Sequence, residues 1–158
     1  MALQRISSAL ITDATVATGD IADDAITAAK LDAAALAAGT FSGSVQFSGA
    51  VTLNEDTLSD GATVSWDVTA SPVAKLTLGG NRTLSAPSNA VGAGQYISLL
   101  VIQDGTGSRT LTWNAAYEFK DDTAPTLTTT ASKGDLFTFR YNGSKWLETG
   151  RNQNLTLS

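Results

Sequence analysis

The amino-acid sequence predicts a mainly β protein. Its C-terminal part is expected to be an antiparallel β-sandwich of the jelly-roll type, preceded by a short helical or extended segment and a β shaft. Three observations lead to this prediction. Apolar and polar residues alternate in short runs after residue 61, and glycine, asparagine and aspartate separate these runs. Alternation with a period of two is typical of strands, and such separating residues are typical of turns. The third observation is a change of composition near residue 60.

The composition of the 158 residues argues against several classes of protein. The chain has no cysteine and no histidine, so it forms no disulfide and holds no Ser-His-Asp or Cys-His catalytic group. A net charge of −5 and a pI near 4.5 argue against a nucleic-acid-binding surface. We find no apolar run long enough to span a membrane and no signal peptide at the start. We therefore expect a protein that is not an enzyme and needs no cofactor or metal.

The change of composition predicts three parts, at residues 1–40, 41–60 and 61–158. Residues 1–60 carry two basic residues, Arg5 and Lys30, against eight carboxylates. No aromatic residue precedes Phe41, and all three tryptophans follow residue 61. An acidic, alanine-rich leader therefore precedes an aromatic, threonine-rich body, and we expect the two to fold by different physics.

The leader contains a predicted helix at residues 24–38, which ends at Gly39. Its apolar positions Ile26, Ala29, Ala33 and Leu36 follow a 3-4-3 spacing, as in a coiled-coil seam. A helix of this length with a narrow alanine face is marginal alone, so it needs a partner. The partner is either another copy of the chain or the body of its own chain.

A tighter repeat follows in the predicted shaft. The pattern F-S-G-x-V occurs at 41–45 and again at 47–51, six residues later. Since six is even, Phe41, Val45, Phe47 and Val51 point to one side of an extended chain. Two repeats are too few for a solenoid that buries itself, and copies from neighbouring chains would supply the rest. The alternative is a plain ribbon or linker.

The body is predicted to be antiparallel throughout. The run from Ile97 to Ile102 is nearly continuously apolar, as expected for a central strand covered on both faces. The dipeptide Asn142-Gly143 is the best hairpin signal in the chain. The candidate strands are 62–68, 73–78, 95–103, 109–113, 126–130, 135–141 and 145–148.

Several motifs of the body resemble a β domain of tailed-bacteriophage fibre and tail-associated proteins. They lie at 57–67 (TLSDGATVSWD), 76–84 (LTLGGNRTL), 101–107 (VIQDGTG) and 140–146 (RYNGSKW), so the resemblance covers roughly residues 57–150. Upstream, residues 19–31 are similar to a short repeat of phage fibre shafts. The resemblance implies a structural protein of the virion, as a rule a homotrimer with parallel chains.

This resemblance leads to a functional expectation. We expect a short homotrimeric fibre of the phage tail or head, or a capsid decoration protein, made in the cytoplasm of the bacterial host. The N-terminal segment would dock on capsid, neck or tail proteins, and the β domain would project outward. Neither nucleic acid nor membrane insertion is expected. The residues expected at the trimer interface are Ile11, Val16, Ile21, Ile26, Ala29, Ala33, Leu36, Phe41, Val45, Phe47 and Val51.

An alternative function is host-receptor binding through the C-terminal domain. Exposed aromatic rings suit the apolar face of a sugar, and Trp113, Tyr117 and Trp146 are the candidates for a glycan contact. The same residues are equally suited to a core, and alternating strands favour the core. The acidic pair Asp121-Asp122 is interpreted as a solvated loop, since no further carboxylate follows at metal-ligand spacing.

Overall fold

Strands dominate the described part of the chain, which comprises residue 46 and residues 48–157 of a computed structural model. Contacts divide the chain into two units at 1–49 and 50–158, and the second unit holds every strand of the described residues. The predicted helix at 24–38 and the first F-S-G-x-V unit lie outside the described residues. The body begins earlier than residue 61, since β1 (Glu55–Thr57) pairs with β3 (Val73–Leu78).

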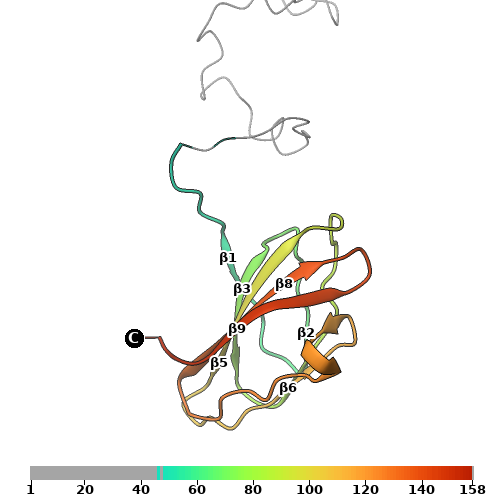
Figure 1. The fold of residues 1–158 in the computed structure, drawn as a ribbon. Coiled ribbons are helices and arrows are strands. Elements are labelled where there is room, and N and C mark those ends of the chain that lie inside the picture. The colour runs from blue at the N-terminus through green and yellow to red at the C-terminus, as the bar shows by residue number, and fades with distance from the viewer. Residues whose placement is uncertain (1–45, 47, 158) are drawn as a thin grey trace, which may run out of the picture. The chain divides into compact units, whose positions relative to one another are not determined.

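Two sheets make up the body (Figure 1). The larger sheet has the order β1-β3-β5-β8-β9-β7, and the smaller has the order β2-β4-β6. The remaining bounds are β2 (Thr63–Val64), β4 (Arg82–Leu84), β5 (Tyr96–Gln103), β6 (Leu111–Trp113), β7 (Tyr117–Glu118), β8 (Lys133–Tyr141) and β9 (Trp146–Thr156). Among the described residues, no helix has the length and apolar character to cross a membrane.

The first six strands form a parallel coil. The chain passes alternately from the larger sheet to the smaller one, so each strand pairs with the strand two positions away in sequence. The pairs β1·β3 and β3·β5 are parallel, and so are β2·β4 and β4·β6. Each pair of strands is therefore one turn of the coil, and the third turn ends at β6.

The prediction of a mainly β fold is confirmed, whereas the prediction of antiparallel pairing throughout is wrong. Only β5·β8 and β8·β9 are antiparallel, and Asn142-Gly143 closes the β8–β9 hairpin as predicted. The glycine-rich turns at 79–81 and 104–107 instead carry the chain across to the other sheet. Such residues permit a sharp change of direction, but they do not determine whether the next strand returns beside the previous one.

The predicted strand at 126–130 is absent, because side chains satisfy its backbone groups in place of a neighbouring strand. The carboxylate of Asp135 is 2% exposed and accepts hydrogen bonds from the Thr128 amide at 2.7 Å and from its hydroxyl at 2.7 Å. It also accepts one from the Asn154 amide at 2.9 Å. The side-chain amide of Gln153 donates to the Thr126 carbonyl. A buried carboxylate thus pins this segment beside β8 and β9.

One apolar core lies between the inner faces of the two sheets. The larger sheet contributes Leu76, Leu99, Phe137 and Phe139, which are fully buried, and the smaller contributes Val64 and Leu84. Trp113 touches this core from β6, with its ring centroid 5.0 Å from that of Phe137 in an edge-to-face arrangement. Such aromatic pairs add to the apolar burial and tie the antiparallel hairpin to the coil.

Removing one of these rings is expected to be costly. We predict that Phe139→Ala lowers the free energy of unfolding by about 3–5 kcal/mol, because a fully buried ring leaves a cavity. The control is Val91→Ala, at a side chain that is 75% exposed, which should change stability by less than about 0.5 kcal/mol. Chemical denaturation of the full chain measures both. Similar values for the two variants would show that the aromatic cluster is not the core of the body.

Candidate functional site

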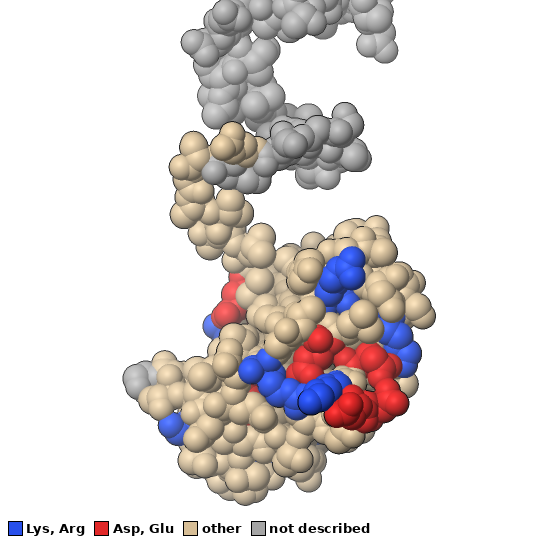
Figure 2. Space-filling view, in the orientation of Figure 1, with Lys and Arg blue, Asp and Glu red and all other residues tan. Residues whose placement is uncertain are grey.

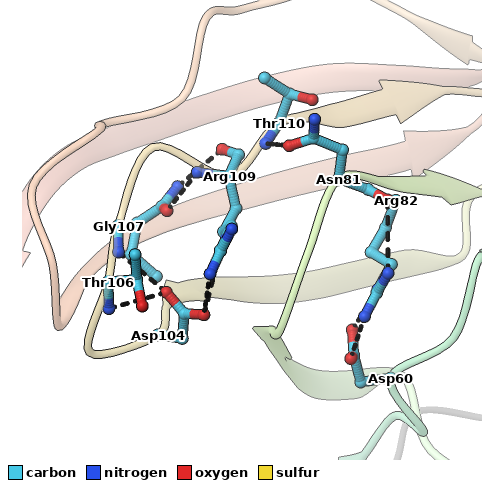
Figure 3. Close-up of polar contacts among 9 residues, drawn as sticks. Asp60, Asn81, Arg82, Asp104, Thr106, Gly107, Arg109 and Thr110 are labelled. Carbon is cyan, nitrogen blue, oxygen red and sulfur yellow. Dashed lines mark hydrogen bonds and ion pairs between the residues drawn. The ribbon is translucent and has the colours of Figure 1, made fainter.

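Polar contacts join the successive turns of the parallel coil at one end (Figure 3). The guanidinium of Arg82, at the start of β4, donates two hydrogen bonds of 2.6 Å to the carboxylate of Asp60 in the preceding turn. Asn81 reaches the following turn, where its side-chain oxygen accepts from the Thr110 amide at 3.1 Å. The Arg82 amide also donates to the Thr110 carbonyl. Residues 81 and 82 therefore connect all three turns of the coil.

The turn between β5 and β6 is held by its own side chains. Asp104 accepts from the amides of Thr106 and Gly107 and from the guanidinium of Arg109, at 2.8–3.0 Å. The side chain of Gln103, which is 3% exposed, forms two hydrogen bonds with the backbone of Arg109. Its amide nitrogen donates to the Arg109 carbonyl, and its oxygen accepts from the Arg109 amide. The side chains of Gln103, Asp104 and Arg109 are therefore all hydrogen-bonded within the turn and hold its shape.

The two aspartates in these turns have shifted acidities. The hydrogen bond from Arg82 lowers the pKa of Asp60 below its ordinary value of 3.8. The hydrogen bond from Arg109, assisted by the Gly107 amide, lowers the pKa of Asp104 in the same way. Both carboxylates are therefore ionised in the folded body at neutral pH. The sequence places Asp104 and Arg109 on either side of one glycine-rich turn, and this pair could have been noticed there. Asp60 lies 22 residues before Arg82, so no local pattern pairs these two.

Most residues predicted at a trimer interface lie outside the described residues, namely Ile11, Val16, Ile21, Ile26, Ala29, Ala33, Leu36, Phe41, Val45 and Phe47. Val51 is described and is 59% exposed. Leu53, two residues further along, is 54% exposed. The interface itself stays a prediction, and these two side chains are free of cover within the described part of the chain.

The three aromatic residues proposed for glycan contact lie in or against the core. Tyr117 and Trp146 are buried, and Trp113 packs between Tyr117, Phe119 and Phe137. Burial raises the pKa of the Tyr117 hydroxyl, which has no partner among the described residues. Because Tyr117 and Trp146 show no open ring face, the fold offers them no sugar-stacking platform. Glycan binding stays a prediction, and these buried rings do not support it.

Charged groups gather around the short 3-10 helix η4 (Lys120–Asp122) and β7, on the face seen in Figure 2. Glu118 lies 3.2 Å from the Lys145 ammonium. Its hydrogen bond to Asp122 raises the pKa of Asp122 and lowers that of Glu118. The described residues hold no group of three or more acidic side chains placed to bind a metal ion. Asp121 and Asp122 are exposed, as the interpretation as a solvated segment predicts, although they lie in η4 and not in a loop.

The parallel coil, the polar contacts between its turns and the antiparallel β8–β9 hairpin together form a β domain with one apolar core. Residues 63–146, from β2 to the start of β9, match the family model described as "Putative phage tail fibre C-terminal domain". The chain therefore belongs to this phage tail fibre family, which makes it a component of the phage particle. Searches of curated proteins and of solved structures gave no match.

The close packing of the Asp104 turn predicts a strong effect of a single methyl group. In Gly107, with φ of +76°, a Cβ atom would lie 2.5 Å from the Thr129 carbonyl oxygen and 2.8 Å from the Ala131 nitrogen. Gly107→Ala should therefore destabilise the body by at least about 2 kcal/mol. Gly105→Ala is the matched control, because nothing lies within 4 Å of its Cβ position. Equal denaturation midpoints for the two variants would contradict this account of the turn.

The lowered pKa values of Asp60 and Asp104 predict loss of stability in acid. A carboxylate with a lower pKa in the folded state stabilises the fold above its ordinary pKa and loses this effect as pH falls through the folded value. The double variant Asp60→Asn/Asp104→Asn should therefore lose less stability between neutral pH and pH of about 3 than the natural chain does. Asp121→Asn, at an exposed position, should keep the natural pH dependence. Thermal unfolding followed by circular dichroism makes the comparison, and identical pH profiles for all three proteins would rule out this role.

Proposed function

We propose that the chain is a non-enzymatic structural protein that forms a short homotrimeric fibre of the virion. Its N-terminal segment anchors the fibre to capsid, neck or tail proteins, and the β domain projects outward. The chain is synthesised in the cytoplasm of the bacterial host. Membership in a phage tail fibre family supports the virion role. The observation that carries the proposal is the match over residues 63–146, behind a leader that differs from the body in composition.

The trimer is supported by the chemistry of the leader. Half of the apolar residues at 1–51 are alanine, so bulky apolar side chains are few, and they stand on an acidic background. Closed rotational symmetry lets identical narrow stripes cover one another, so that several weak contacts act together. Val51 and Leu53, which are exposed in the described part of the chain, extend this pattern to the start of β1.

The structural role is supported by the contacts that the polar side chains of the body make with one another. Asp60, Arg82, Asp104 and Arg109 are all committed to contacts within the coil. The three aromatic rings predicted for a glycan contact, Trp113, Tyr117 and Trp146, are packed in or against the core. The body is thus built as a stable projecting unit, and its surface contacts serve assembly in this proposal.

Oligomeric mass tests the proposal. Light scattering of the full chain after size-exclusion chromatography should give the mass of three chains of 16.3 kDa. Phe47→Asp should move the mass toward a single chain, because a carboxylate in an apolar interface loses its hydration without gaining a partner. Ile26→Asp should act in the same way. Gln46→Asp is the matched control, since it adds the same charge at the neighbouring polar position and should leave the mass unchanged.

The outcomes separate the parts of the proposal. A natural chain that is a folded monomer at micromolar concentration would overturn the homotrimer. A trimer that persists in both Phe47→Asp and Ile26→Asp would remove the leader and shaft from the interface.

A further inference from the structure

The outward faces of the two sheets differ in chemistry. On the smaller sheet, Thr63, Thr83 and Thr112 are in register across the three strands, and all three are exposed. Exposed hydroxyl side chains of this kind form hydrogen bonds with water and need no protein partner. This face is built to meet water.

The outward face of the larger sheet is apolar at its centre. Leu99 and Val101 point into the core, so their neighbours Leu100 and Ile102 point outward. Leu100 lies opposite Leu136, and Ile102 lies in the row of Gly134 and Leu155. All four of these apolar side chains are only half-buried. They form, with Leu157, a patch that we call the outer leucine face: Leu100, Ile102, Leu136, Leu155 and Leu157.

Gly134 shows how closely this face is packed within the chain. A Cβ atom on Gly134 would lie 3.0–3.1 Å from the methyl groups of Leu157 and Leu100. The residue after β9 therefore folds over Gly134 and adds apolar surface to the face, although Leu157 itself is 44% exposed. The composition of β5 predicts that both of its faces are covered. Within this chain, only the inward face is fully covered, and the outward face with its leucines stays partly open.

The outer leucine face is continuous with the segment proposed to wind the copies together. Leu53 lies beside Pro72, Val73 and Tyr96, around a shallow hollow of about 160 Å³ on the same sheet. Val73, Ser98 and Thr138 form the row of this sheet next to that of Leu100 and Leu136. Leu53 therefore lies one row of residues away from the outer leucine face, on the same side of the sheet. In the proposed trimer, copies that meet along 51–53 would also have their outer leucine faces near the same axis.

We propose that the outer leucine face is an interface between copies of this chain, with the threonine row of the smaller sheet turned to solvent. This inference rests on the proposed homotrimer and adds that the β domains, and not only the leaders, are in contact. The occupant is a second copy, because closed symmetry places identical faces around one axis, where apolar centres cover each other. Lys75 and Arg140 lie at the margin of the apolar rows. Polar residues at the rim of an interface remain accessible to solvent.

Thiol labelling tests this interface, because the chain contains no cysteine. Asn152 is exposed and lies opposite Leu136 on the outer face, whereas Thr112 is exposed on the threonine face. In the full-length chain, we expect a maleimide to label Asn152→Cys at least about tenfold more slowly than Thr112→Cys, because the thiol must wait for the interface to open. Adding Phe47→Asp, which is expected to separate the copies, should bring the two rates together.

A charge on the face provides the second measurement. Leu136→Lys in the Asn152→Cys chain should raise its labelling rate toward that of Thr112→Cys, since the half-buried leucine is not needed to close the core. Thr83→Lys is the matched control, because it adds the same charge at an exposed strand position on the other sheet and should leave the rate unchanged. Circular dichroism confirms that each variant retains its strands.

Each outcome has one meaning when mass and labelling are read together. A trimer in which both cysteines react equally fast would overturn the inference and leave the proposed function standing. A monomer with slow labelling at residue 152 would also overturn it, because another part of the same chain would then cover the face. A monomer with fast labelling would overturn both the inference and the homotrimer.

Discussion

The body depends on the register of its parallel coil. Each strand of the coil pairs with the strand two positions away in sequence. The chain must therefore return in the correct register after it has crossed to the other sheet and back. The connections are unequal in length, so the register is set where turns touch, and residues 81 and 82 make these contacts in both directions. A parallel coil gains nothing until non-local strands meet, which is why fixed turns matter more here than in a hairpin fold.

The same constraint explains the buried polar groups. Gln103 and Asp135 are almost fully buried, yet each has its partners on the backbone of a segment that would otherwise lack a neighbour. Backbone amides and carbonyls that leave water must be paired, and a coil with irregular connections cannot pair them all through strands. Side-chain carboxylates and amides therefore complete the sheets. The body therefore tolerates little change at Gln103 and Asp135.

The distribution of apolar groups suits a part that assembles. The aromatic rings fill the space between the sheets, so the core does not rely on a partner. The outward leucines and the threonine row then divide the surface into two unlike sides. In the proposed fibre, many modest contacts of this kind would act together without any single strong site.

Local pattern was sufficient for several elements. Strand β3 lies at residues 73–78 as predicted, and the β8–β9 hairpin closes at Asn142-Gly143, because alternation and turn chemistry act between near neighbours. The same reasoning placed a strand at 126–130, where the carboxylate of Asp135, seven residues after Thr128, provides the partner instead of a strand. Alternation favoured a core position for the aromatic residues 113, 117 and 146 without excluding a sugar site. The fold places Trp113 and Tyr117 against Phe139 and buries Trp146 beside Tyr141.

By itself, the amino-acid sequence determined that the body is mainly β, where many of its turns fall and that its composition differs from that of the leader. Only the tertiary structure decided that six strands run parallel, that Asp60 meets Arg82 and that the leucines of β5 and β8 share an open face. The physical reason is that periodicity reports which side of a strand is apolar, whereas pairing partners are chosen by contacts between residues far apart in the chain.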